Sequence, residues 1–266
     1  MSMLDLVRVE FKLVYGDLFR RKSAFITFIL YPYIFTSFTL FIGYAVGSPR
    51  GFVERVGVDP VIYMITASYM LMSIFSSIDD LLWRPLLDLH IGTLPYIIAS
   101  PVNRLKYYTA IPIPRLVAVL LLGFTSILPV YILYYGLEGV AVVFVVISIL
   151  IVGCLTMVFF SIALAMSIHR VGESWRMLNI VRPVLMILMG VYYPRMFMPL
   201  ASYILSSFIP SSHAVEAVQR FLMGMSSDIY ILIVLAIAIS FIYMPIGKIS
   251  IREWEKSRVR RGVETF

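Results

Sequence analysis

The sequence predicts an all-α integral membrane protein with six transmembrane helices and both termini on the cytoplasmic side. Three observations support this fold class. Hydrophobic residues make up 61% of the 266 residues and charged residues only 14%, with a mean hydropathy of +0.93, whereas a soluble domain has roughly 45–50% apolar and about 25% charged residues. The apolar residues form long runs, as membrane spans do. The basic residues gather beside alternate ends of those runs, which predicts their orientation.

Residues 1–22 are predicted to form an amphipathic helix at the membrane surface. Apolar residues recur there at spacings of three and four and so share one helix face: Leu4, Val7, Phe11, Val14 and Leu18. Asp5, Arg8 and Lys12 fall on other faces, and the basic run 20–22 is expected at the level of the lipid head groups. We expect this helix on the cytoplasmic surface, where its polar face can also touch a partner.

Six apolar segments follow, and together with their flanks they fill residues 23–266. They cover residues 24–46, 61–78, 116–135, 140–168, 184–193 with an extension that begins near Leu178, and 229–246. The first, at about 1.5 Å per residue, is long enough to cross an apolar layer of about 30 Å. The fifth is interrupted by Pro194 and Pro199, and the apolar stretch 200–209 after it is too short to cross alone. That stretch is therefore predicted to be a re-entrant or surface element on the far side, within an extracellular segment at residues 194–228.

The distribution of basic residues predicts the orientation of these segments, because cytoplasmic flanks are enriched in Lys and Arg. Of the 22 such residues, 18 lie in four flanks on one side of the predicted membrane: residues 1–22, 79–115, 169–182 and 247–266. The other side holds four: Arg50, Arg55, Arg195 and Arg220. Both termini and the loop 79–115 are therefore expected in the cytoplasm, and the expected location of the protein is the plasma membrane. The charge lies beside apolar runs, so no nucleic-acid partner is expected.

Motifs for nucleotide binding or hydrolysis are absent from the sequence. It has no Gly-x4-Gly-Lys-Ser/Thr loop and no HExxH, GxSxG or CxxC motif. The cores of the predicted spans contain essentially no ionisable residues, which argues against a proton relay. The single cysteine, Cys154, lies inside an apolar run, so neither a disulfide nor a cysteine-based metal site is expected.

One acidic cluster leaves open an enzymatic alternative. The stretch "DDLLWRPLLDLH" contains Asp79, Asp80, Asp88 and His90 at the end of the second span. Oxygen ligands there could hold Mg²⁺ on a diphosphate, as in a membrane-embedded lipid or prenyl transferase. A second such cluster would be expected and is absent, so a solvated helix end is the simpler interpretation, and we expect no metal site in this chain.

Gly43 and Gly47 form a GxxxG pair at the end of the first span. Such pairs let two membrane helices approach closely, so these glycines are a candidate contact between two copies. The alternative is that Gly47 only ends the helix.

The segment "LHIGTLPYIIASPVNR" between the second and third spans is similar to a loop of the ABC-2 type permeases, the membrane subunits of ATP-driven exporters. Its Gly-Thr-Leu and Ser-Pro-Val-x-Arg residues match the family pattern, whereas Leu89–His90 replace an Arg-Glu pair and Pro95 replaces a Glu. A second similarity lies in "GVYYPRMFMP" and "IPSSHAVEAVQRFLMG". It implies that five residues shape the re-entrant extracellular segment: Pro194, Pro199, Pro210, Glu216 and Arg220.

The resemblance implies a half-transporter. Two permease chains, identical or related, would enclose one pathway, and two copies of a separate ATPase subunit would bind below and carry the ATP and Mg²⁺. This chain would have no cofactor and no enzymatic activity of its own. The loop 79–115 would dock the ATPase through a short coupling helix, with Thr93 as a candidate N-cap and Arg104 and Lys106 facing acidic groups of the partner. The implied coupling residues are Gly92, Thr93, Leu94, Ser100, Pro101, Val102, Asn103 and Arg104.

The expected cargo is a hydrophobic or amphipathic small molecule or a lipid, moved out of the cytoplasm or inner leaflet. Aromatic and Met residues are abundant in the first two spans and suit such cargo, although they also suit packing against lipid. Three alternatives stay open: a permease for polysaccharide or glycolipid, a six-span channel or scaffold without an ATPase, and the Mg²⁺-dependent transferase.

Overall fold

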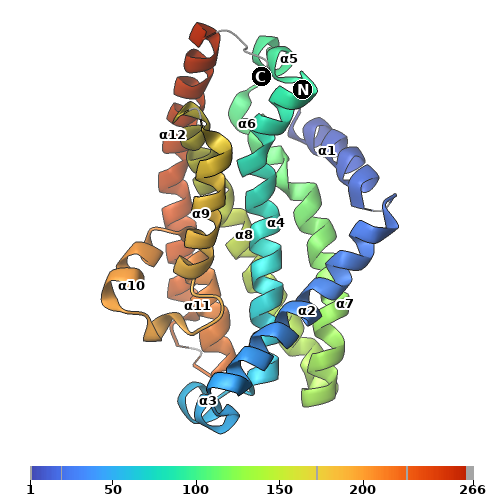
Figure 1. The fold of residues 1–266 in the computed structure, drawn as a ribbon, viewed down its shortest axis with the longest axis vertical. Helices are drawn as coiled ribbons and strands as arrows, with labels where there is room; N and C mark the ends of the chain where they lie inside the picture. Colours follow the sequence, from blue (N-terminus) through green and yellow to red (C-terminus); the bar gives the residue numbers. More distant parts are fainter. Residues whose placement is uncertain (1, 19, 172, 226, 262–266) are drawn as a thin grey trace.

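The computed structural model describes residues 2–18, 20–171, 173–225 and 227–261, and every regular element in those ranges is a helix. The elements are α1 (Met3–Leu18), α2 (Lys22–Val46), α3 (Pro49–Val56), α4 (Pro60–Ile91), α5 (Leu94–Ala99), α6 (Arg104–Ala110), α7 (Pro112–Tyr135), α8 (Glu138–Val171), α9 (Ser174–Leu188), the 3-10 turn η1 (Arg195–Phe197), α10 (Leu200–Ser207), α11 (Pro210–Leu222) and α12 (Ile229–Arg261). Figure 1 shows an elongated bundle in which α2 crosses obliquely in front of helices that follow the long axis.

Five helical segments among the described residues are long and apolar enough to span a membrane. They are Phe25–Ala45, Pro60–Ile91, Arg104–Tyr135, Glu138–Val171 and Ile229–Arg260. The all-helical fold that the sequence predicts is confirmed for the described residues, and these apolar helices support a membrane-embedded protein.

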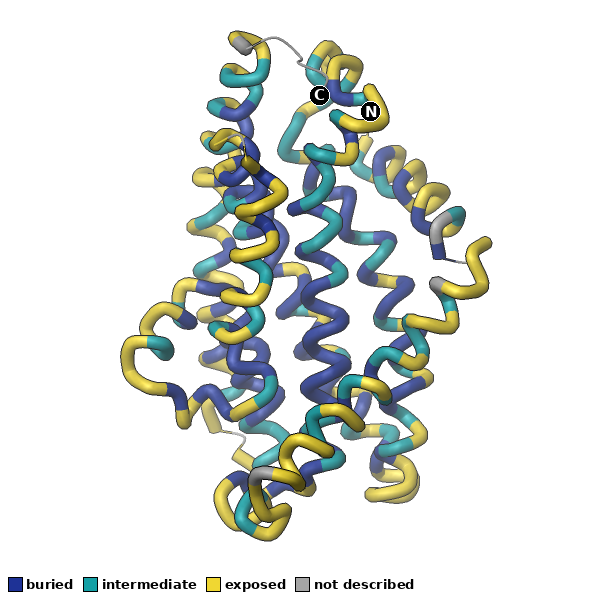
Figure 2. The backbone as a smooth tube through the Cα atoms, in the orientation of Figure 1, coloured by how far each residue is buried: buried dark blue, intermediate teal, exposed yellow. Residues whose placement is uncertain are grey.

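Helix α4 is the centre of the bundle. In its most apolar window 83% of residues are buried, against 11% for the span in α2 and 17% for the span in α12. Helices α2, α7 and α8 pack around it, and Figure 2 shows α4 as the most continuous dark-blue element. Helices α2 and α12 therefore present most of their apolar surface outward, as lipid-facing helices do.

The ends of the predicted spans agree with the structure for α2, α7 and α8, but not for α4 and α12. Helix α4 continues past the predicted end at residue 78 to Ile91, and α12 continues past residue 246 to Arg261. In both cases the charged residues beyond the apolar run stay helical because partners on other helices bind them: Arg84 binds Glu10, and Glu255 binds Arg104.

The predicted fifth span differs most from the structure. Helix α9 begins earlier than expected, at Ser174, and ends at Leu188, where Met189 is the C-cap and Gly190 adopts a left-handed conformation with φ +64°. Its 15 residues are fewer than the roughly 20 that a full crossing needs. The apolar stretch after it forms η1 and α10, and α11 then packs on α8 and α12 in the half of the molecule away from α5 (Figure 1).

The predicted amphipathic helix exists as α1, but the predicted buried face is rotated. Ser2 and Asp5 begin the helix with reciprocal hydrogen bonds of a capping box, and these bonds lower the pKa of Asp5. The face that packs on the bundle carries the buried residues Leu6, Glu10, Val14 and Leu18. Leu4 and Phe11, which the spacing placed on that face, are exposed.

Helix α1, helix α5 and the last turns of α12 lie at one end of the bundle, and α3 and the α7–α8 turn lie at the other (Figure 1). Both α1 and α12 contact α6, which joins α5 to α7. Residues 1 and 262–266 lie outside the described residues. Helix α1 and the last turns of α12 lie at the same end of the bundle, and the cytoplasmic location predicted for both termini stays a prediction.

Candidate functional site

The corner between α4 and α5 is formed by Gly92 and Thr93. Gly92 has φ +78° and is the C-cap of α4, so it ends that helix instead of starting the next. Thr93 occupies the N-cap position of α5 but makes no capping hydrogen bond there. Its hydroxyl instead donates to the Asp88 carboxylate at 3.0 Å. Thr93 thus stands at the predicted N-cap position, but its side chain binds α4 and does not cap α5.

Helix α5 is a six-residue helix at the tip of the loop, as the resemblance implied for a coupling helix. Leu94 is 1% exposed and packs in an apolar cluster with Tyr108 and Trp254. Pro95 is in the first turn, where its missing N–H costs nothing. Tyr96 points outward and is 78% exposed. One side of α5 thus packs against the bundle through Leu94, and the other side exposes the ring of Tyr96.

Arg104 organises this loop from within. Its Nε donates to Glu255 of α12 at 2.6 Å, and its Nη1 and Nη2 donate to the carbonyl oxygens of Ile98, Ser100 and Val102 at 2.7–2.9 Å. Arg104 therefore braces α5 against α12, instead of being directed at a partner. Lys106, two residues further along α6, is basic and exposed.

The other predicted loop residues shape the backbone. The Ser100 hydroxyl accepts the Val102 N–H at 3.3 Å, and Pro101 follows at the surface. Asn103 is the N-cap of α6, because its side-chain oxygen accepts the Lys106 N–H at 3.2 Å. The structure thus brings the eight predicted coupling residues into one compact turn between α4 and α6.

A largely buried ion-pair network joins α1, α4 and α6, and the sequence analysis did not predict it. Arg84 donates to Glu10 at 2.9 and 3.1 Å and to Asp88 at 3.1 and 3.2 Å. Its Nη2 also donates to the Tyr107 hydroxyl at 2.9 Å. Glu10 is only 5% exposed. One sequence signal could have identified Glu10 as buried: it lies four residues from both Leu6 and Val14, which are on the buried face of α1.

The acidic cluster of the transferase alternative does not converge. Asp79 pairs with Arg182 at 2.6 Å, Asp80 with Arg115 at 2.8 Å and Asp88 with Arg84 at 3.1 Å. His90 bonds its own helix at the Leu86 carbonyl. Within the described part of the chain, no group of three or more His, Cys, Asp or Glu residues is arranged to hold a metal ion. Each carboxylate is held by a different arginine, which does not favour Mg²⁺ chemistry here.

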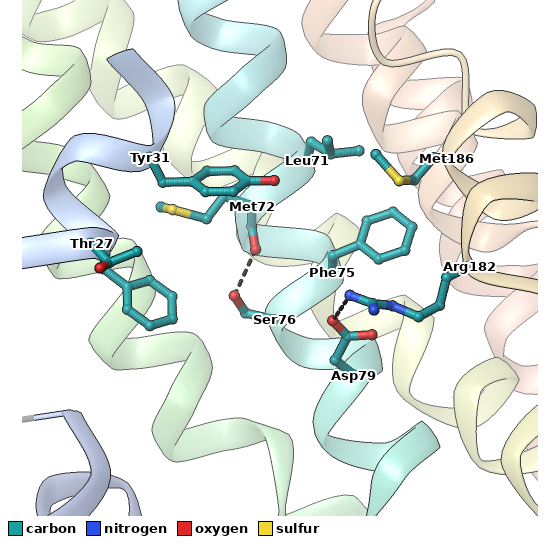
Figure 3. A pocket seen from close by; sticks show the side chains of 10 residues that line it. Thr27, Tyr31, Leu71, Met72, Phe75, Ser76, Asp79, Arg182 and Met186 are labelled. Atoms are coloured by element: carbon teal, nitrogen blue, oxygen red, sulfur yellow. Dashed lines mark hydrogen bonds and ion pairs between the residues drawn. The ribbon is translucent and has the colours of Figure 1, made fainter. Parts of the chain in front are cut away.

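A cavity of about 220 Å³ lies between α2, α4 and α9 (Figure 3). Most of its wall is apolar, with Tyr31 and Phe28 from α2 and Met186 from α9. Helix α4 supplies Leu71, Met72, Phe75 and Ser76, and the Ser76 hydroxyl donates to the Met72 carbonyl at 2.7 Å. The Asp79–Arg182 ion pair forms its charged end.

The segment predicted as re-entrant is held by a buried arginine. Arg195 is 0% exposed, and its Nε and Nη atoms donate to Ser206, Ser207 and Glu216 at 2.7–2.8 Å. Its guanidinium also lies 4.7 Å from the Tyr203 ring centroid. The carboxylate of Glu216 accepts from Arg220 as well, at 2.6 and 3.0 Å. Glu216 and Arg220 were predicted for this segment, whereas the central residue, Arg195, was not.

His213 completes this cluster in its neutral form. Burial lowers its pKa, and the nearby Arg195 cation lowers it further. Its Nδ1 lies 3.2 Å from Arg195 Nη1 and its Nε2 lies 3.0 Å from the Ser207 carbonyl. Only a neutral ring with hydrogen on Nε2 satisfies both contacts, since Arg is always a donor and a carbonyl always an acceptor.

The three prolines predicted for this segment each stand at a helix start. Pro194 and Pro199 are the N-caps of η1 and α10, and Pro210 is the first residue of α11.

The GxxxG pair lies on the exposed surface of α2. Gly47 is the C-cap of α2, and its N–H donates to the Gly43 carbonyl at 2.8 Å. A methyl group built on Gly43 would meet no atom of this chain within 4 Å. The expectation that Gly47 ends the helix is confirmed, and contact between two copies stays a prediction.

Comparisons with known proteins return nothing for this chain: no family model, no curated protein and no solved structure matches it.

Proposed function

We propose that this chain is the membrane subunit of an ATP-driven exporter of the ABC-2 type, which moves a hydrophobic or amphipathic small molecule or a lipid out of the cytoplasm or inner leaflet. The observation that carries the proposal is the construction of α5. It is a short helix beyond the end of the central helix, braced from inside and exposing Tyr96 at its surface. Such a protrusion suits docking of a separate ATPase, which would supply ATP and Mg²⁺.

The bracing of α5 explains how movement of a docked partner would reach the spans. Thr93 ties α5 to α4, and Arg104 ties it to α12 through Glu255. Arg84 extends the connection from α4 to α1 through Glu10. A displacement of α5 would thus act on three helices together, and ATP-driven closure of two ATPase subunits would shift the bundle between inward-facing and outward-facing states. It does so only if the partner binds the two states with different affinity.

The proposed topology puts the α5 end of the bundle in the cytoplasm, because most basic residues lie in the flanks at that end. Helix α9 would enter from that side as the sixth membrane segment. Residues 194–228 would then form the re-entrant extracellular segment, and the Arg195 cluster supports this because it satisfies the charges of that segment internally, as membrane burial requires.

The experiment that tests the function is capture of the tagged chain from its own membranes in mild detergent, with identification of bound proteins. Replacing the whole 92–104 loop would remove the bonds of Thr93 and Arg104 and so disturb α4 and α12. Tyr96→Ala is the sharper variant, because the ring is exposed. Aromatic contacts at the centre of an interface are worth about 2 kcal/mol or more, so retention should fall roughly thirtyfold.

Leu137→Ala is the matched control, since Leu137 is 86% exposed and lies in the α7–α8 turn at the opposite end. A nucleotide-binding subunit retained by wild type and Leu137→Ala and lost from Tyr96→Ala supports the exporter. Capture of no nucleotide-binding subunit by a chain that stays folded contradicts it and favours the channel or scaffold alternative.

A further inference from the structure

We propose that the cavity between α2, α4 and α9 binds the head group of a zwitterionic amphiphile that carries a primary ammonium beside a phosphate, as in an ethanolamine phospholipid. This inference names a substrate class for the proposed exporter, and its interpretation as cargo rests on that function. Three features support the binding itself: the Asp79–Arg182 ion pair, the apolar wall of the cavity and the position of Asp79 along α4.

The ion pair at the charged end of the cavity is only half satisfied. Asp79 Oδ2 accepts from Arg182 Nη2 at 2.6 Å. The other carboxylate oxygen, Asp79 Oδ1, and the Arg182 Nε are both buried, and neither has a hydrogen-bond partner among the described residues. Leaving a buried polar atom unpaired destabilises the fold, so a ligand that pairs it gains affinity. The site therefore lacks one donor for the carboxylate and one acceptor for the guanidinium.

A phosphoethanolamine head supplies both missing groups. Its ammonium has three N–H donors, as a lysine has, and can satisfy Asp79 Oδ1. Its phosphate accepts from a guanidinium in a charge-assisted bond and can satisfy Arg182. A purely cationic or purely anionic head would satisfy one atom and leave the other unpaired.

The wall beyond the ion pair suits the apolar part of the same molecule. Figure 3 shows Asp79 and Arg182 together at one end, with Phe75 beside them and Leu71, Met72 and Tyr31 farther along. Leu71, Met72 and Phe75 come from a part of α4 without charged side chains, because none lies between Pro60 and Asp79. A volume of about 220 Å³ holds a head group and the start of a chain, so the rest of the chain would extend into lipid.

The depth of the pair agrees with a head-group site. Asp79 follows Pro60 along α4 by a distance of about 28 Å at about 1.5 Å per residue, close to the roughly 30 Å of a bilayer's apolar layer. With Pro60 at one boundary of that layer, Asp79 lies at the other, and Leu71 and Met72 lie inside it. Lipid head groups occupy that boundary and their chains occupy the interior.

The test is a comparison of two single-chain lipids, lysophosphatidylethanolamine and lysophosphatidylcholine, bound to the full chain and measured by native mass spectrometry. They differ in the N–H donors of the ammonium, which choline lacks. Because Asp79 Oδ1 needs a donor, wild type should bind the ethanolamine lipid about tenfold more tightly. Equal affinities, or a preference for choline, would overturn the proposal.

The Asp79→Asn, Arg182→Gln double variant removes the ion pair without leaving one charge unpaired in the bundle. We expect the ethanolamine preference to fall to within about twofold while the chain elutes as wild type does. The matched control is Glu173→Gln, Arg176→Gln, which removes an exposed 3.0 Å pair at the start of α9. A preference that survives in the Asp79, Arg182 variant also overturns the proposal.

Two further comparisons are informative. The first distinguishes a bilayer lipid from a single-chain amphiphile, and the second distinguishes failure of the head-group site from failure of the exporter proposal. Equal binding of diacyl phosphatidylethanolamine points to a bilayer lipid, and binding of the lysolipid alone points to a single-chain amphiphile. Both agree with the site. Head-group preference without capture of an ATPase keeps the site and removes the exporter. Capture of an ATPase without head-group preference keeps the exporter and removes this cargo.

Discussion

Arg195 shows at the scale of one residue what the sequence did not indicate. It is one of only four basic residues outside the predicted cytoplasmic flanks, and in the fold it is fully buried and bonded to side chains of α10 and α11. Prolines and the Glu216–Arg220 spacing were visible in the sequence. The convergence of Ser206, Ser207 and Glu216 on one guanidinium depends on the path of the chain between α9 and α11, which no local pattern encodes.

Glu216→Gln tests the role of this cluster in stability. Removing one partner of a buried ion pair leaves the other charge uncompensated and costs about 3–5 kcal/mol. Glu216 is 2% exposed and binds both Arg195 and Arg220. We expect the midpoint of thermal unfolding in detergent to fall by about 5 °C or more. Glu138→Gln, at the exposed first residue of α8, is the control, and equal midpoints for the two variants would contradict this role.

At the scale of elements, the sequence predicted the apolar parts of the helices well and their charged continuations poorly. Helices α2, α7 and α8 follow the expected runs, because apolar length determines them. The extensions of α4 and α12 depend on ion pairs with distant residues, which spacing along one helix cannot reveal. For α1, the predicted stripe consisted of apolar residues only and did not include Glu10. Packing against Arg84 makes Glu10 part of the buried face.

Glu10→Gln tests the attachment of α1. The substitution removes a carboxylate that accepts from Arg84 at 2.9 and 3.1 Å in a site where it is 5% exposed. Hydrogen bonds to charged groups contribute about 1.5–3 kcal/mol, so amide hydrogen exchange in α1 should become roughly tenfold faster while exchange in α8 is unchanged. Lys12→Gln, on the exposed face of α1, should leave the rates as in wild type. Unchanged rates in Glu10→Gln would show that α1 is held by its apolar residues alone.

At the scale of the whole molecule, two regions distinguish this bundle from five packed spans. One end carries α1, α5 and the end of α12, linked to α4 by Arg84 and Arg104. The opposite half contains the short α9 and the Arg195 cluster, where a shorter helix and a folded segment stand in place of the predicted fifth span. Charge and proline positions in the sequence marked where these two regions begin, but not the Arg84 and Arg195 clusters that hold them. The sequence could not predict that α9 would be too short to cross alone, because that depends on the turn at Gly190.

The central claim is that the α5 end docks a nucleotide-binding subunit, and site-specific photocrosslinking in intact cells tests it most directly. A photoreactive amino acid replaces Tyr96 in one variant and Leu137 in another, both exposed and at opposite ends of the bundle. We expect a crosslink from position 96 to a nucleotide-binding protein and none from position 137. The same crosslink from position 137, or no crosslink to a nucleotide-binding protein from position 96, would contradict it.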